Sequence, residues 1–440
     1  MPPSPSPPET SLPLTFFDVF WLQSHPVERL FLYRLAHDAD VEAIISNLRS
    51  SLHKALAAFY PLAGRVRLAP GTSDRYELHY RPGDAVTFTV AECDDDVDGD
   101  AHFDALATDE PREVAKIAAL VPTLPRGGRL LAVRATLLPA RRGLAIGVTL
   151  HHAACDGSGS THFLHTWAAT CRGGGAESPP PPVIDRTLLA DPRRLYDAFV
   201  QTAPSSEEYE FVKMSADQLF ATFTLSKDDL KRIKDAVADE AARRGVAPPR
   251  CSSLVATFGL VWSCYQRTKE RSSGAGEASM ACMAFPVDHR SRMKPPLPEK
   301  YLGNCVGPAF ALAPTGELAA AGAGGLFSAC AAVASAIDEA VRDIGTSSMD
   351  AWMDRIREVL PMGLLTVAGS PRFRVYDLDF GFGRPAKVDI VSVARTGAVA
   401  VAESRSGDGG IEVGVSLQPA AMERYRKCFA DATLWLHQKT

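Results

Sequence analysis

The segment at residues 151–157 reads HHAACDG and directly follows an apolar run at residues 144–150. The apolar run predicts a strand, so rigid backbone would hold the ring of His152 where the strand ends. An imidazole titrates near neutrality and can therefore take up a proton and return it within one cycle. Asp156 could orient the ring or lock the loop, and Gly157 permits a tight backbone turn. The segment predicts a general base, although a buried histidine beside a loop aspartate gives the same pattern.

Two helices are predicted to frame this strand. Residues 40–59 repeat apolar side chains every three or four positions behind Asp40, a typical N-cap residue. Ser160 could begin a second helix, with Phe163, Leu164 and Trp167 on one face.

The second half of the chain also mixes strands and helices, without a regular alternation. Ser226 is predicted to cap one helix and Ser252 or Ser253 another, while residues 319–344 are mostly helical. Residues 388–417 predict two or three strands, joined by the hairpin sequence RSGDGG. We therefore predict an α+β fold of two similar-sized domains with mixed sheets: residues 1–185, a crossover loop at 186–215, and residues 216–440.

Composition excludes several classes of function. The 440 residues carry a net charge of -5 with scattered basic residues, which argues against a nucleic-acid partner. No apolar run approaches the ~18 residues that span a bilayer, and the first residues do not read as a signal peptide. Nine scattered cysteines without a CxxC pair indicate reduced thiols. We expect a cytoplasmic protein that binds neither membrane nor nucleic acid.

Two other chemistries fit the residues poorly. A hydrolase could use Cys155 as its nucleophile, but no G-x-S-x-G elbow is present. A metal site could be built from nearby histidines, but their spacing lacks the H-E-x-x-H pattern, so we predict no metal; these are His151, His152, His162 and His165.

Four further segments give little evidence of function when each is taken alone, because each also fits an ordinary turn or surface loop. They are FYPLAGR at 59–65, VDHRSR at 287–292, YLGNC at 301–305 and DFGFG at 379–383. Together with HxxxD at His152 and Asp156, and in this order, they resemble the plant BAHD acyltransferase family along nearly the whole chain. The C-terminal motif, DFGWG in that family, corresponds to Asp379, Gly381, Phe382 and Gly383, so this chain has phenylalanine where tryptophan is usual.

The resemblance implies a chloramphenicol-acetyltransferase-like fold with a channel between the two domains. His152 would deprotonate an acceptor hydroxyl, which attacks an acyl-CoA thioester directly. Asp156 would point away from the channel and pair with Arg290, with Gly157 in the same supporting loop. The DFGFG segment would be structural, and the protein a monomer without a permanently bound cofactor.

Within the family, YLGNC and the sequence around it look like the clade that malonylates flavonoid, anthocyanin and phenolic glucosides. A malonyl group carries a carboxylate and so needs a cation, for which Arg292, Arg172 and Lys387 are candidates. Ser252, Ser253 and Asn304 are predicted to contact coenzyme A. Three alternatives remain: a coumaroyl- or acetyl-CoA-dependent member, a non-catalytic binding member, and a peptide-synthetase condensation domain, which shares HHxxxDG.

Overall fold

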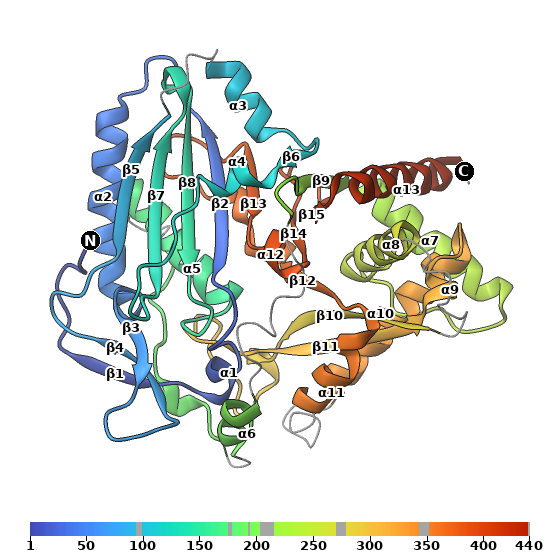
Figure 1. The fold of residues 1–440 in the computed structure, drawn as a ribbon, viewed down its shortest axis with the longest axis horizontal. Coiled ribbons are helices and arrows are strands. Elements are labelled where there is room, and N and C mark those ends of the chain that lie inside the picture. The colour runs from blue at the N-terminus through green and yellow to red at the C-terminus, as the bar shows by residue number, and fades with distance from the viewer. Residues whose placement is uncertain are drawn as a thin grey trace.

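The computed structural model describes residues 1–93, 99–174, 178–191, 194–202, 215–269, 279–342 and 352–438. In this part of the chain the strands form three sheets, and the helices cover them (Figure 1). The mixture of parallel and antiparallel pairs without βαβ repetition is the predicted α+β arrangement.

The first sheet lies in the half of the molecule that holds the N-terminus. Its strand order is β13 (Lys387–Ile390), β2 (Val27–Arg34), β8 (Gly143–Leu150), β7 (Leu131–Leu137) and β5 (Thr87–Glu92). Helices α2 (Val41–Ala58) and α5 (Gly157–Cys171) pack against each other and share one apolar core with it. Asp40 caps α2 as predicted, since its side chain accepts from the backbone of Ala43.

The second sheet is longer and is covered by four helices. Its order is β11 (Val306–Pro314), β10 (Met280–Asp288), β12 (Leu365–Gly369), β14 (Val399–Glu403), β15 (Ile411–Leu417), β9 (Leu219–Leu225) and β6 (Arg112–Glu113). The core beneath it includes side chains of α7 (Lys227–Arg243), α8 (Ser253–Thr268), α10 (Ala323–Arg342) and α13 (Pro419–Gln438). Ser226 and Ser252 cap α7 and α8 as predicted, and β14 and β15 form the expected hairpin.

Shorter elements connect these layers. A third sheet has the order β1 (Thr10–Pro13), β4 (Tyr76–Tyr80) and β3 (Arg65–Leu68). The remaining helices are α1 (Phe16–Val19), α3 (Gly99–Ala107), α4 (Val114–Ala118), α6 (Leu195–Thr202), α9 (Thr315–Leu318), α11 (Trp352–Val359) and α12 (Val393–Thr396). Residues 319–344, predicted to be mostly helical, contain α10, which begins just after a turn at Gly322, where φ is +68°; residues 343–344 lie outside the described residues.

The two halves of the chain exchange strands. β13 comes from the second half but pairs with β2 of the first sheet, and β6 comes from the first half but pairs with β9 of the second. Neither sheet is therefore built from one continuous half of the chain. The domain limits 1–185 and 216–440 stay predictions. Of the crossover segment 186–215, residues 192–193 and 203–214 lie outside the described residues.

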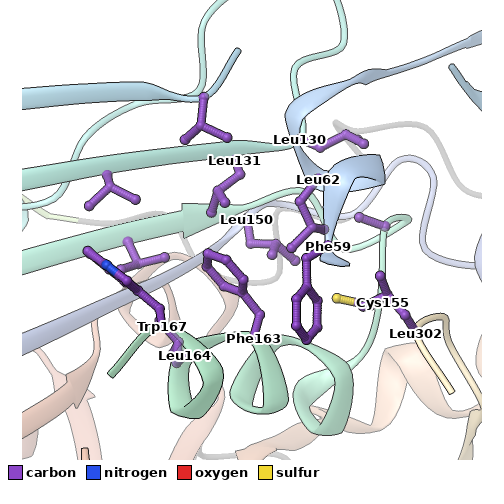
Figure 2. Packing of buried hydrophobic residues seen from close by; sticks show 14 of the residues in the cluster. Phe59, Leu62, Leu130, Leu131, Leu150, Cys155, Phe163, Leu164, Trp167 and Leu302 are labelled. Carbon is purple, nitrogen blue, oxygen red and sulfur yellow. The ribbon is translucent and has the colours of Figure 1, made fainter. Parts of the chain in front are cut away.

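Helix α5 is held against the first sheet by its apolar face. Figure 2 shows Phe163, Leu164 and Trp167 projecting from the helix toward the strands and toward Phe59 and Leu150. All five side chains are buried. Each contributes about 1.5–3 kcal/mol through removal from water, so the start of α5 is fixed relative to the end of β8.

Among the described residues, one helix, α10, is long and apolar enough to cross a membrane. It packs against α7, α8 and β11, and half of its most apolar window is buried. Buried core helices satisfy the same criterion, so this is weak evidence for a membrane span.

A buried ion pair ties the exchanged strands together. Arg112 of β6 donates to both carboxylate oxygens of Asp389 on β13, at 2.8 and 3.0 Å, and the side chains are 4% and 1% exposed. Removing one partner of such a pair leaves an uncompensated buried charge, so Asp389→Asn should lower the free energy of unfolding by about 3–5 kcal/mol.

Scanning calorimetry measures this as a fall in the unfolding midpoint. The matched control is Asp354→Asn, which breaks an exposed pair with Arg357 and should cost less than about 1 kcal/mol. Equal midpoints for the two variants would contradict a structural role for the buried pair.

Candidate active site

The loop between β8 and α5 carries the histidine predicted to act as a base. The backbone amide of His151 still bonds to the carbonyl of Leu130, at 2.8 Å, so the sheet holds the loop up to this residue. Helix α5 then begins at Gly157, with Asp156 as its N-cap accepting from the amide of Gly159 at 3.1 Å. The prediction that Ser160 caps this helix was wrong, because Asp156, four residues earlier, caps it by accepting from the amide of Gly159.

Gly157 is needed for a close approach rather than for an unusual backbone angle. A Cβ atom at this position would lie 2.5 Å from the ring of Phe373. The ring of Phe373 can therefore lie directly against the start of α5.

Asp156 is fully engaged with protein groups. Arg290 of the short 3-10 helix at Arg290–Arg292 contacts both carboxylate oxygens, at 2.8 and 3.0 Å, and the amide of Cys305 donates to one of them at 3.0 Å. Arg290 also donates to the carbonyls of Tyr301 and Gly303. The expected pair is present, and its geometry makes Asp156 a group that fixes the loop.

Asn304 lies behind the catalytic loop. Its side-chain amide donates to the carbonyl of His152 at 2.9 Å and to the carboxylate of Asp18 at 3.0 Å, and the residue is fully buried. Asn304 therefore supports the loop, and its contact with coenzyme A stays a prediction. Asp18 is in turn paired with the buried Arg186, at 3.2 Å.

The His152 ring lies against an aromatic side chain, and its surroundings favour the neutral form. It stacks on the indole of Trp21, with centroids 4.1 Å apart and planes at 14°. Burial lowers the pKa of His152 below its usual value, although the nearby Asp156 carboxylate and Asn304 side chain act in the opposite direction. A neutral imidazole is the form that accepts a proton.

The side chain of the neighbouring His151 stabilises the turn that follows it. The Nδ1 atom of His151 accepts from the amide of Ala153 at 3.2 Å. Burial, with the adjacent His152, lowers the pKa of His151 to about 4. Cys155 is buried and its pKa is raised, first by burial, so it is a poor nucleophile at neutral pH.

The DFGFG segment forms a turn supported from within. The Asp379 carboxylate accepts from the amides of Gly381 and Gly383, at 2.7 and 3.0 Å, and both glycines have a φ near +100° that favours glycine. Phe382, which replaces the usual tryptophan, packs edge-on against Tyr33 at 5.0 Å. These contacts lie within the turn and against β2, which is consistent with the structural role expected of this motif.

The three basic side chains suggested to bind a malonyl carboxylate each contact other groups of the protein. Lys387 is buried and bonded to Asp109 and to the Thr222 hydroxyl. Arg172 is exposed and donates to the Asp379 carbonyl, and Arg292 is exposed and donates to the Asp288 carbonyl at 2.7 Å. The structure therefore corrects the suggestion for Lys387, whose charge is already compensated inside the protein.

The serines suggested for coenzyme A lie at the start of α8. The Ser252 hydroxyl accepts from the amide of Val255 at 3.3 Å, and the Ser253 hydroxyl accepts from Lys234 at 2.9 Å. A contact with coenzyme A stays a prediction for both. No group of three side chains in the described ranges is arranged to hold a metal ion.

Comparisons with known proteins agree with this arrangement. The model of the Transferase family matches residues 1–431 of the chain. The chain belongs to the BAHD acyltransferase family. It is 33% identical to phenolic glucoside malonyltransferase 1 of Arabidopsis thaliana, covering 94% of this chain and 91% of the relative. It is 32% identical to an anthocyanidin 5-O-glucoside malonyltransferase of the same plant, covering 97% and 95%.

Solved BAHD-like structures share the fold. Vinorine synthase superposes with a TM-score of 0.67 at 20% identity, covering 94% of this chain and 91% of its own. The F. graminearum TRI101 protein in complex with coenzyme A and deoxynivalenol gives 0.68 at 17% identity, covering 95% and 97%. The predicted fold class is confirmed, and membership of this acyltransferase family decides against a hydrolase and a peptide-synthetase condensation domain.

Sequence reasoning missed Asp18, Arg186 and Trp21. Asp18 ends the segment LTFFD at residues 14–18, where an aspartate within an apolar run was the available signal. Trp21 gave no signal, because its stacking on His152 joins residues 131 positions apart.

Loss of the Asp156 charge should affect stability and activity together. Asp156→Asn leaves Arg290 without its buried counter-ion, so we expect a loss of about 3–5 kcal/mol and a slower reaction. Unfolding midpoints and turnover measure the two effects. The control is Asp288→Asn, the exposed second partner of Arg290, which should cost less than about 1 kcal/mol. An unchanged midpoint in Asp156→Asn would refute its structural role.

Trp21 should act as a positioning residue for His152. Trp21→Ala removes one wall of the imidazole site, so turnover should fall about 10- to 100-fold through misplacement. Water would also reach the ring, and the acid limb of the rate profile should move to higher pH as the pKa of His152 rises toward its usual value. The control Trp21→Phe keeps a stacked ring and should keep the acid limb. An unmoved limb in Trp21→Ala would contradict this role.

Proposed function

We propose that this acyltransferase moves the malonyl group of malonyl-CoA to a hydroxyl of a phenolic or flavonoid glucoside, with His152 as the general base. The observation that carries the proposal is a half-buried imidazole whose backbone and ring are both held by other side chains and whose pKa is lowered by burial. Such a base needs no acyl-enzyme, which agrees with the poor nucleophilicity of Cys155.

In the reaction, His152 accepts one proton and later returns it, and a carbon–oxygen bond replaces the carbon–sulfur bond of the thioester. The acceptor hydroxyl gives its proton to His152 while its oxygen bonds to the thioester carbonyl carbon. The carbon–sulfur bond of the intermediate then breaks, and His152 returns the proton to the leaving thiolate sulfur. His152 ends the cycle neutral, ready for the next acceptor.

The donor and acceptor classes rest on relatives. Five of the similar proteins are named as malonyltransferases acting on phenolic, anthocyanin or anthocyanidin glucosides. A coumaroyltransferase of anthocyanidin glucosides is also similar, at 28% identity over 96% of this chain. Coumaroyl-CoA is therefore the second candidate donor, and the fold is compatible with both.

A donor screen tests the proposal. Purified protein is incubated with malonyl-, acetyl- and coumaroyl-CoA in turn, with a mixture of flavonoid and simple phenolic glucosides, and free thiol is followed. We expect thiol release with malonyl-CoA that requires a glucoside. Release with coumaroyl-CoA instead would refute the malonyl donor while keeping the mechanism.

His152→Ala is the matched control enzyme in this screen. Loss of a general base typically costs 10²–10⁴-fold, so thiol release should fall at least about 100-fold without a change in folding. His151→Ala should be milder, because its ring bonds only to the local turn among the described contacts. Near-native turnover in His152→Ala would refute the mechanism.

A further inference from the structure

A cavity lies between the two sheets, and a single described cation faces it. Its volume is about 30 Å³, and its walls come from β2, β9, β12, β13, β14 and β15 and from Phe373. Three charged side chains line it: Arg29, Asp389 and Glu412. A cavity of this size has room for a small polar group rather than for a whole substrate, since one water molecule needs roughly 10–15 Å³.

Both carboxylates of this cavity are already compensated. Asp389 accepts two hydrogen bonds from Arg112, as described above. Glu412 accepts from Arg405 at 2.8 Å and from the Tyr376 hydroxyl at 2.6 Å. Neither carboxylate is therefore available as a partner for a further cation.

Arg29 differs from them in its surroundings. It is 5% exposed, and its guanidinium donates to the Thr161 hydroxyl at 2.9 Å and lies 5.8 Å from the centroid of the Phe373 ring. Across the described ranges it forms no ion pair with a carboxylate. Burial lowers the pKa of Arg29 to about 10, so the group is still charged at neutral pH. A buried cation without a counter-ion is costly and is compensated when an anion binds.

The position of Arg29 relates it to the catalytic loop. Thr161 belongs to the first turns of α5, the helix that begins directly after Asp156. A Cβ atom on Gly157 would lie 3.7 Å from the Arg29 guanidinium, and the charge of Arg29 acts on the His152 ring. The cation therefore stands beside the loop that holds the base, at the edge of the cavity.

We propose that Arg29 binds the free carboxylate of the donor's malonyl group and thereby selects it over uncharged acyl groups. A guanidinium presents two parallel N–H groups that match a carboxylate, and the cavity shields the pair from water. This inference rests on the proposed function, because it assumes a donor with a carboxylate. A carboxylate on the acceptor has the same chemistry, and the experiment separates the two sources.

The test compares selectivity between donors. For wild type, Arg29→Lys and Arg29→Gln, kcat/KM is measured with malonyl-CoA and acetyl-CoA, each with one glucoside that has no carboxyl group and one that has. We expect the malonyl-to-acetyl ratio to fall about 10- to 100-fold in Arg29→Gln, the effect of one charged hydrogen bond, and less in Arg29→Lys. Affinity for malonyl-CoA, measured by calorimetric titration, should fall in the same order.

Arg357→Gln is the control, since it removes an exposed cation of the same type and should leave the ratio as in wild type. Unfolding midpoints show that the variants are folded, and Arg29→Lys keeps the test meaningful if Arg29→Gln does not fold.

Three results overturn the inference. An unchanged ratio in Arg29→Gln would mean that a different group recognises the carboxylate, while the proposed function stands. A defect that appears with acetyl-CoA to the same extent, or only with carboxylated acceptors, would assign Arg29 to general positioning or to the acceptor. A wild-type enzyme that does not use malonyl-CoA would refute the proposed function itself, and the inference with it.

Discussion

A buried carboxylate, Asp156, and a buried guanidinium, Arg290, join the loop after β8 to the segment after β10. Charges taken out of water are stabilising only when their hydrogen-bonding groups are satisfied, and here the pair is completed by backbone groups on both sides. Burial opposes the charge of Arg290, yet Asp156 raises its pKa above the usual value. The pair therefore fixes two loops from different sheets in one geometry, with the catalytic histidine between a fixed strand and a fixed helix.

A second buried pair brings the N-terminal segment to the same place. Asp18 is held by Arg186 and accepts from the backbone and side chain of Asn304, whose amide also holds the carbonyl of His152. Because Trp21 follows Asp18 by three residues, the same contact sets the indole against the imidazole. The base is thus positioned through its backbone and its ring by residues from three distant parts of the chain.

The exchange of strands between the halves explains why the site forms at their boundary. β13 and β6 each complete the sheet of the other half, and the apolar cluster between the sheets contains residues of both. A rigid boundary can keep a cavity open beside a charged group such as Arg29, because the walls belong to sheets that cannot collapse onto each other.

The sequence by itself determined the local features of this protein. Spacing and backbone chemistry predict the strand that ends just before His151 and His152. They also predict the helix caps at Asp40, Ser226 and Ser252 and the hairpin between β14 and β15. The ordered motifs also determined the family and the pairing of Asp156 with Arg290. The tertiary structure decided which charged residues are free to meet a substrate. Lys387 and Arg29 are both basic residues in strands. Lys387 pairs with the carboxylate of Asp109, whereas Arg29 contacts the hydroxyl of Thr161 and the ring of Phe373. Partners that are hundreds of residues apart in the chain are brought together by packing, and one sequence carries no local signal of such contacts.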